Sequence, residues 1–130
     1  MAIRDDFAPG EILTAADLND TFSSKANETV SITAATADYT LALTDASKLV
    51  TVNSASAATV TVPPNTSVAL TVGAAIAVAQ TGAGQVAIAA GSGVTINSTA
   101  GTAPKLTDQY AGAQCYKTAT DTWLVIGSIE

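Results

Sequence analysis

No charged residue occurs between Lys48 and Lys105, although the 130-residue chain carries a net charge of −6, with 11 Asp and Glu against 5 Lys and Arg. Soluble domains normally keep their surface hydrated with charged side chains. In this uncharged segment Thr, Ser, Asn and Gln must take that role, or neighbouring chains must cover part of the surface. The segment therefore predicts assembly with other chains.

From about Val30 onward, apolar residues recur at every second position, which is typical of β-strands. Hydrophobic residues make up 48% of the chain but aromatic residues only 5%, so Ala and Val supply most of the apolar mass, beside abundant Thr. Val and Thr are β-branched residues that favour strands. The predicted strands are 39–43, 49–53, 58–62, 75–80, 85–89, 94–97, 112–119 and 122–126.

Two of these segments predict which face is buried. In 49–52 and 58–62, valines occupy one face of the strand and threonines or other residues the second face. This pattern is typical of a sheet with one face toward the core and one toward water. The predicted core residues are Val50, Val52, Val60 and Val62.

The turns between the segments are rich in Pro, Gly, Asp and Ser, as in 63–65, 81–84 and 91–93, and predict hairpins and meanders. We therefore expect a mainly β fold, an antiparallel β-sandwich or a barrel-like domain. Thr-x-Thr and Val-Thr-Ile elements would also suit an ice-binding solenoid, but no fixed repeat of about 20 to 50 residues emerges.

The segment 75–90 has a different pattern, because its large apolar residues alternate with alanines rather than with polar residues. Both of its faces are therefore expected to be covered, since an alanine-lined face permits close approach of another sheet or subunit. The large apolar residues are Ile76, Val78, Val86 and Ile88.

The first 28 residues are expected to form an arm and a short anchoring helix, ahead of a β-rich domain over 29–130. Thr14 and Asp17 are placed to cap a helix that runs to about Ala26. Its apolar stripe is too narrow for a helix alone in water, so the helix must pack on its own domain, on other copies or on a larger particle. The predicted docking or inter-subunit residues are Ile3, Phe7, Ile12, Leu13, Leu18 and Phe22.

The residue inventory excludes most enzyme chemistry. The chain has no histidine and a single cysteine, Cys115, which leaves no Ser-His-Asp or Cys-His machinery, no zinc cluster and no intrachain disulfide. The Gly-x-Gly of 81–84 links two strands and precedes no helix that could bind a phosphate. We therefore predict no catalytic, cofactor-binding or metal-binding residues, a buried and inert Cys115, and Trp123 in the core.

Charge and hydropathy also limit the kinds of partner that the chain is expected to bind. The acidic net charge provides no basic footprint for nucleic acid or an anionic membrane, and the most apolar stretch, 68–79, is short for a membrane-spanning helix. Residues 1–10 include Arg4, Asp5 and Asp6 and lack the apolar core of a signal peptide. We expect no nucleic-acid or membrane partner, and synthesis in the cytoplasm without secretion by a signal peptide.

Two segments carry a resemblance to a known family. The opening FAPGEILTAADLNDTF (Phe7 to Phe22) resembles the start of many tailed-bacteriophage tail and fibre-like structural proteins. The body, with YTLALTDASKLVTVNSASAATVTVPPN, GAAIAVAQTGAGQVAIAAGSGVTINS and TDTWLVIGSI, is similar to a β-rich module of phage virion proteins. The resemblance covers almost the whole chain from Phe7 to Ile129.

This resemblance implies a noncatalytic virion component, trimeric as in many such proteins, with an N-terminal anchor and a projecting β-domain. The chain lacks the shaft and separate tip of a long fibre, which favours a capsid decoration protein that binds the major capsid protein or another virion protein in many copies. The alternative is a short tail fibre, collar or tail-tip appendage that adheres to a host-surface glycan through its loops or an exposed Trp123. The trimer is expected to associate through the neutral, Ala- and Val-rich faces.

Overall fold

The computed structural model describes residues 29–130, which form two β-sheets packed on a shared core. The elements are β1 (Ile32–Ala35), β2 (Tyr39–Thr40), the 3-10 helix η1 (Leu43–Asp45), β3 (Leu49–Val52), β4 (Ala58–Val62), β5 (Ala75–Gln80), β6 (Val86–Ala90), β7 (Thr95–Asn97), β8 (Gly112–Ala119) and β9 (Thr122–Gly127). One sheet has the order β1-β3-β5-β8-β9-β7 and the other β2-β4-β6. The predicted arm and helix of residues 1–28 lie outside the described residues.

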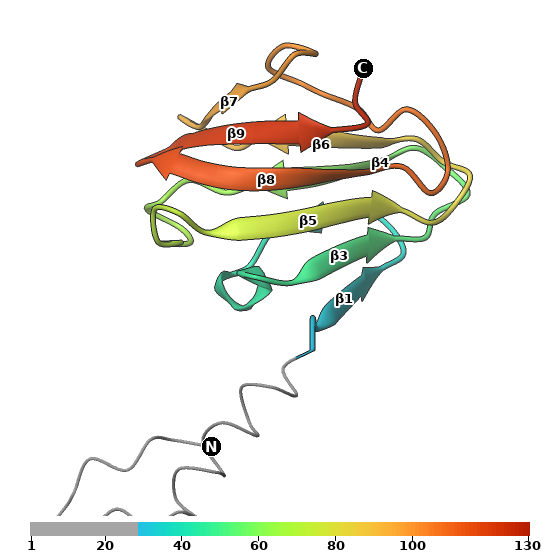
Figure 1. Cartoon of the computed structure of the whole chain (residues 1–130), viewed down its shortest axis with the longest axis horizontal. Coiled ribbons are helices and arrows are strands. Elements are labelled where there is room, and N and C mark those ends of the chain that lie inside the picture. The colour runs from blue at the N-terminus through green and yellow to red at the C-terminus, as the bar shows by residue number, and fades with distance from the viewer. Residues whose placement is uncertain (1–28) are drawn as a thin grey trace, which may run out of the picture.

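The first six strands form a short parallel coil. The chain alternates between the two sheets, so that β1 and β2, β3 and β4, and β5 and β6 make three successive turns. Strands of successive turns pair in parallel, β1 with β3 with β5 and β2 with β4 with β6. Figure 1 shows β1, β3, β5, β8 and β9 side by side in one layer, with β4 and β6 behind them.

The expectation of an antiparallel fold is therefore wrong for most of the domain, which has one mixed and one parallel sheet. Antiparallel pairing is confined to β5 with β8 and β8 with β9, apart from two isolated bridges. The connections 63–65, 81–84 and 91–93, which were predicted to close hairpins, carry the chain from one sheet to the other instead, whereas the turn between β8 and β9 does close a hairpin. A period of two identifies a strand and its buried face, but it contains no information on which strand lies beside it.

The repeat was missed because the turns of the coil differ in length. Ile32 pairs with Leu49, whereas Leu49 pairs with Ala77 across a longer segment that contains the 63–74 loop. Backbone pairing aligns the strands, while the connections absorb the extra residues. A coil of this kind leaves no fixed period in the sequence.

The predicted core is confirmed, because Val50, Val52, Val60 and Val62 are all fully buried. The large apolar residues of β5 and β6 also point into this core, and the alternating alanines are placed on the outer faces. Burying apolar surface contributes about 25 cal/mol per Å², so the facing valines and isoleucines hold the sheets together. The buried apolar residues are Leu41, Val50, Val52, Ala58, Val60, Val62, Leu70, Ile76, Val78, Val86, Ile88, Ile96, Leu106, Ala113, Cys115, Trp123 and Val125.

The first turn of the coil departs from the predicted strand 39–43. The strand β2 ends at Thr40, and the chain enters η1 because the Asp45 carboxylate accepts a hydrogen bond from the backbone N–H of Ala42 at 2.8 Å. Asp45 also accepts hydrogen bonds from Thr33 Oγ1 at 2.8 Å and from the Tyr39 hydroxyl at 2.6 Å. This buried carboxylate therefore joins β1, β2 and η1.

The predicted turn 81–84 links β5 to β6 and stacks directly on the preceding turn of the coil. Gly84 donates its backbone N–H to the carbonyl of Ser54 at 2.8 Å, and a Cβ at Gly84 would collide with the backbone of Ser56. Buried Gln80 closes the turn, because its side chain donates to Gly82 O and accepts from Val86 N. The Gly-x-Gly element thus serves close packing of the coil.

Candidate assembly surface

The outer face of the six-stranded sheet is the candidate site, and strand register defines its residues. One row crosses five strands, from Ile32 through Leu49, Ala77 and Gln114 to Ile126. Ile32 is 63% exposed and Ile126 55% exposed. Large apolar side chains thus face solvent at both ends of a row whose centre is lined by a small alanine.

Two further rows flank this one on the same face. Ala75, Tyr116 and Leu124 form one of them, and Ala34, Thr51 and Ala79 belong to the other. None of the strand residues on this face is charged. We call this surface, made of the outward residues of β1, β3, β5, β8 and β9, the outer sheet face.

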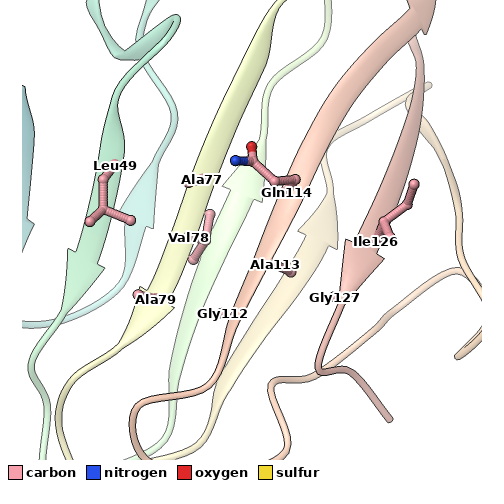
Figure 2. Close-up of a pocket in the computed structure, with 9 residues that line it drawn as sticks. All are labelled: Leu49, Ala77, Val78, Ala79, Gly112, Ala113, Gln114, Ile126 and Gly127. Atoms are coloured by element: carbon pink, nitrogen blue, oxygen red, sulfur yellow. The ribbon is translucent and has the colours of Figure 1, made fainter. Parts of the chain in front are cut away.

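A shallow hollow of about 300 Å³ lies on the outer sheet face. Figure 2 shows its nine lining residues spread over four neighbouring strands, β3, β5, β8 and β9. The hollow exists because Ala77, Ala79 and Gly112 carry little or no side chain between the bulkier Leu49 and Ile126. Its floor is sheet backbone and methyl groups, so it suits an apolar side chain from an apposed surface.

A second hollow, of about 510 Å³, lies beside β9 and is lined by 97–99 and 124–127. The short strand β7 pairs with β9 only as far as Leu124, so the side of β9 opposite β8 lacks a strand partner beyond that point. Leu124 and Ile126 line this hollow and also belong to the outer sheet face.

The outer face of the three-stranded sheet differs in chemistry. It presents Thr40, Thr59 and Thr61 together with Ala87 and Ala89. These positions carry hydroxyl or methyl groups, without the exposed Ile and half-buried Leu side chains of the outer sheet face. The two faces of the domain are therefore unequal, and the apolar one is the better candidate for contact with another protein.

The six predicted docking residues, Ile3, Phe7, Ile12, Leu13, Leu18 and Phe22, lie outside the described residues. The sequence pattern missed most of the outer sheet face, since Ile32, Leu49 and Ile126 come from strands far apart in the chain. The alternating alanines of 75–80 were the one feature of the sequence that pointed to this face, and they do line the centre of the outer sheet face. Cross-strand register was needed to bring these positions together.

The predicted burial of Trp123 and of Cys115 is confirmed. Trp123 is 1% exposed, which removes the option of adhesion through an exposed Trp123 ring. Cys115 is fully buried, and this burial raises the pKa of its thiol to about 12. Tyr116, its neighbour on β8, points to the opposite face and is partly exposed.

Within 29–130, no three Cys, Asp or Glu side chains gather closely enough to hold a metal ion. The same residues contain no helix with the length and apolar character needed to cross a membrane. Comparisons with protein families, with curated proteins and with solved structures found no match to this chain.

Proposed function

We propose that this chain is a noncatalytic structural protein of a tailed-bacteriophage virion, a decoration protein of the capsid surface that assembles as a homotrimer. The observation that carries the proposal is the outer sheet face, an apolar and uncharged surface on a chain of net charge −6. Like-charged copies repel one another where their carboxylates meet. A face without charge is where such copies can approach closely.

The occupant of the outer sheet face in this proposal is a second copy of the chain. Ile32, Leu49 and Ile126 supply the apolar anchors, and the alanine-lined hollow between them receives a side chain of the neighbouring copy. In this proposal the N-terminal residues 1–28, with their apolar side chains, bind the major capsid protein or another virion protein. The resemblance of Phe7 to Phe22 to phage structural proteins supports this division of roles.

The test of the virion role is the copy number of the chain in purified particles of the virus that encodes it, measured by quantitative mass spectrometry against the major capsid protein. Hundreds of copies per particle are expected, because a decoration protein occupies a repeated lattice position. A few to a few tens of copies would instead place the chain on the tail or a unique vertex. Absence from the particle would overturn the virion role.

Self-association is tested separately by sedimentation of the full chain. The wild type is expected to sediment as a trimer, and Leu49→Glu, which places a charge in the apolar row, as a monomer with unchanged circular dichroism. The matched control is Thr61→Glu on the outer face of the three-stranded sheet, which should remain trimeric. A wild type that stays monomeric at high concentration, or a control that dissociates equally, would contradict the assigned face.

A further inference from the structure

Lys117 is buried, which is unusual for a lysine. It belongs to β8, is 3% exposed and points toward the core side of the sheet. Its Nζ donates hydrogen bonds to Asn65 Oδ1 at 2.7 Å and to the carbonyl oxygen of Leu70 at 2.6 Å. Both acceptors are neutral. Burying an ammonium group without a counter-charge is costly, so this position calls for a chemical explanation.

The two side chains are held in place by the surrounding backbone. Lys117 N donates to Ala74 O at 3.0 Å, and Gly73 N donates to Lys117 O at 2.7 Å, which ties the end of the 63–74 loop to β8. At the start of that loop, Asn65 N donates to Asp121 Oδ1 at 2.7 Å. Holding an amine and a carboxamide together in this way raises their effective concentration toward each other.

A carboxylate lies next to this pair. Asp121 occupies the turn between β8 and β9, and its backbone has a positive φ of 53°. Its Oδ1 is bonded to the backbone N–H of Asn65, so the carboxylate stands beside the residue that carries the amide. This makes Asp121 the candidate proton acceptor of the reaction.

We propose that Lys117 and Asn65 condense to an intramolecular isopeptide bond. The Lys117 ammonium gives up a proton, for which Asp121 is the assigned acceptor, and the freed Nζ lone pair forms a bond to Cγ of Asn65. The bond between Cγ and Nδ2 then breaks, and Nδ2 takes up the two protons lost by the lysine and leaves as ammonium. Asp121 returns to its starting state, and the reaction consumes no oxidant, metal or other reagent.

The product removes the buried charge. The positive charge of Lys117 leaves with the ammonium ion, and a neutral amide remains between β8 and the loop that follows β4. The new bond joins two residues 52 positions apart, and it restricts the unfolded chain in the way that a disulfide does. A chain with one cysteine cannot form an intrachain disulfide, so this bond supplies the covalent closure that cysteines cannot.

The first test is the intact mass of the purified, denatured full chain. It is expected to be lower than the sequence mass by one molecule of ammonia, and a tryptic digest should contain the peptide 49–105 joined to 106–130, uncleaved after Lys117. Without the bond, trypsin yields 49–105, 106–117 and 118–130 separately. A folded wild-type chain that keeps its full sequence mass after prolonged incubation would overturn the proposal.

Two variants separate the bond from other chemistry. Lys117→Met lacks the nucleophile and is expected to keep the full mass; ammonia loss that persists in it would come from cyclisation of Asn65 on its own backbone and would overturn the proposal. Asp121→Asn retains an oxygen that can accept from Asn65 N but loses the proton acceptor. It should form the bond much more slowly with unchanged circular dichroism, and an unchanged rate would refute the role of Asp121.

Discussion

The Asp45 carboxylate organises the first turn of the coil, and its contribution can be measured with Tyr39→Phe. This change removes the 2.6 Å hydrogen bond from the Tyr39 hydroxyl and leaves the donors from Thr33 and Ala42 in place. A hydrogen bond to a charged group contributes about 1.5 to 3 kcal/mol. We therefore expect Tyr39→Phe to lower the free energy of unfolding at neutral pH by about 2 kcal/mol, which corresponds to a fall in Tm of roughly 10 °C.

The pH dependence of this loss tests its cause. Burial acts to raise the pKa of Asp45, but hydrogen bonds from Tyr39, Ala42 and Thr33 and the charge of Lys48 outweigh it and lower that pKa below 3.8. A lowered folded pKa adds stability that is present above the unfolded value and is lost as the pH falls through the folded value. The difference between wild type and Tyr39→Phe should therefore shrink as the pH falls below about 4.

At alkaline pH the titrating group is the Tyr39 hydroxyl, and it lowers stability as the pH rises rather than as it falls. The hydrogen bond to Asp45, followed by burial and the Asp45 charge, raises the pKa of Tyr39 from 10.0 to about 12. The raised pKa adds stability that is fully present below 10.0 and is lost as the pH rises toward 12. Tyr39→Phe has no hydroxyl to titrate at this position, so its stability should depend less on pH than that of the wild type as the pH rises toward 12.

The assay is urea unfolding followed by the fluorescence of buried Trp123, at neutral pH and near pH 3, for the wild type and each variant. Tyr110→Phe is the matched control, because Tyr110 is 78% exposed and its substitution should leave stability unchanged. If Tyr39→Phe were equally destabilising at both pH values, the carboxylate would not be the partner responsible, and the reasoning would be refuted.

Two further predictions concern packing and the thiol. Gly84→Ala should destabilise the domain by about 1 to 3 kcal/mol, because its Cβ would collide with the backbone of Ser56. Ala83→Ser, at an exposed position, is the control and should leave the thermal unfolding temperature unchanged. If the two variants were equally stable, the close stacking of the turns would be contradicted. Cys115, with its pKa raised to about 12 by burial, should resist a thiol reagent at neutral pH until the chain unfolds, and rapid labelling of the folded chain would contradict its burial.

The alternation of residues along the sequence was sufficient to assign most strands and their buried faces. The predicted bounds of 58–62, 75–80 and 112–119 match β4, β5 and β8, because alternation over five or more residues is a local property of the strand. Val50, Val52, Trp123 and Cys115 were also placed correctly in the core for this reason. The short β1 (Ile32–Ala35) was not among the predicted strands, and alternation would have misplaced its buried face, because Ile32 is exposed.

Pairing between strands was beyond the reach of the sequence pattern. The parallel coil brings Ile32 beside Leu49 and Leu49 beside Ala77, and only these pairings create the outer sheet face. The hairpins predicted at 63–65, 81–84 and 91–93 were wrong, because a short Pro- or Gly-rich connection can either reverse the chain within a sheet or carry it to the opposite sheet. The turn between β8 and β9 does reverse the chain within its sheet.

Side-chain chemistry inside the domain depended most on tertiary structure. By itself the sequence determined that residues 29–130 would form strands with Val and Ile inward, since residue size and alternation decide which face is buried. Only the fold decided that Lys117 would meet Asn65, or that Asp45 would collect donors from three segments. Lys and Asp are normally expected at the surface. Their burial here requires partners that become neighbours only when distant parts of the coil pack together.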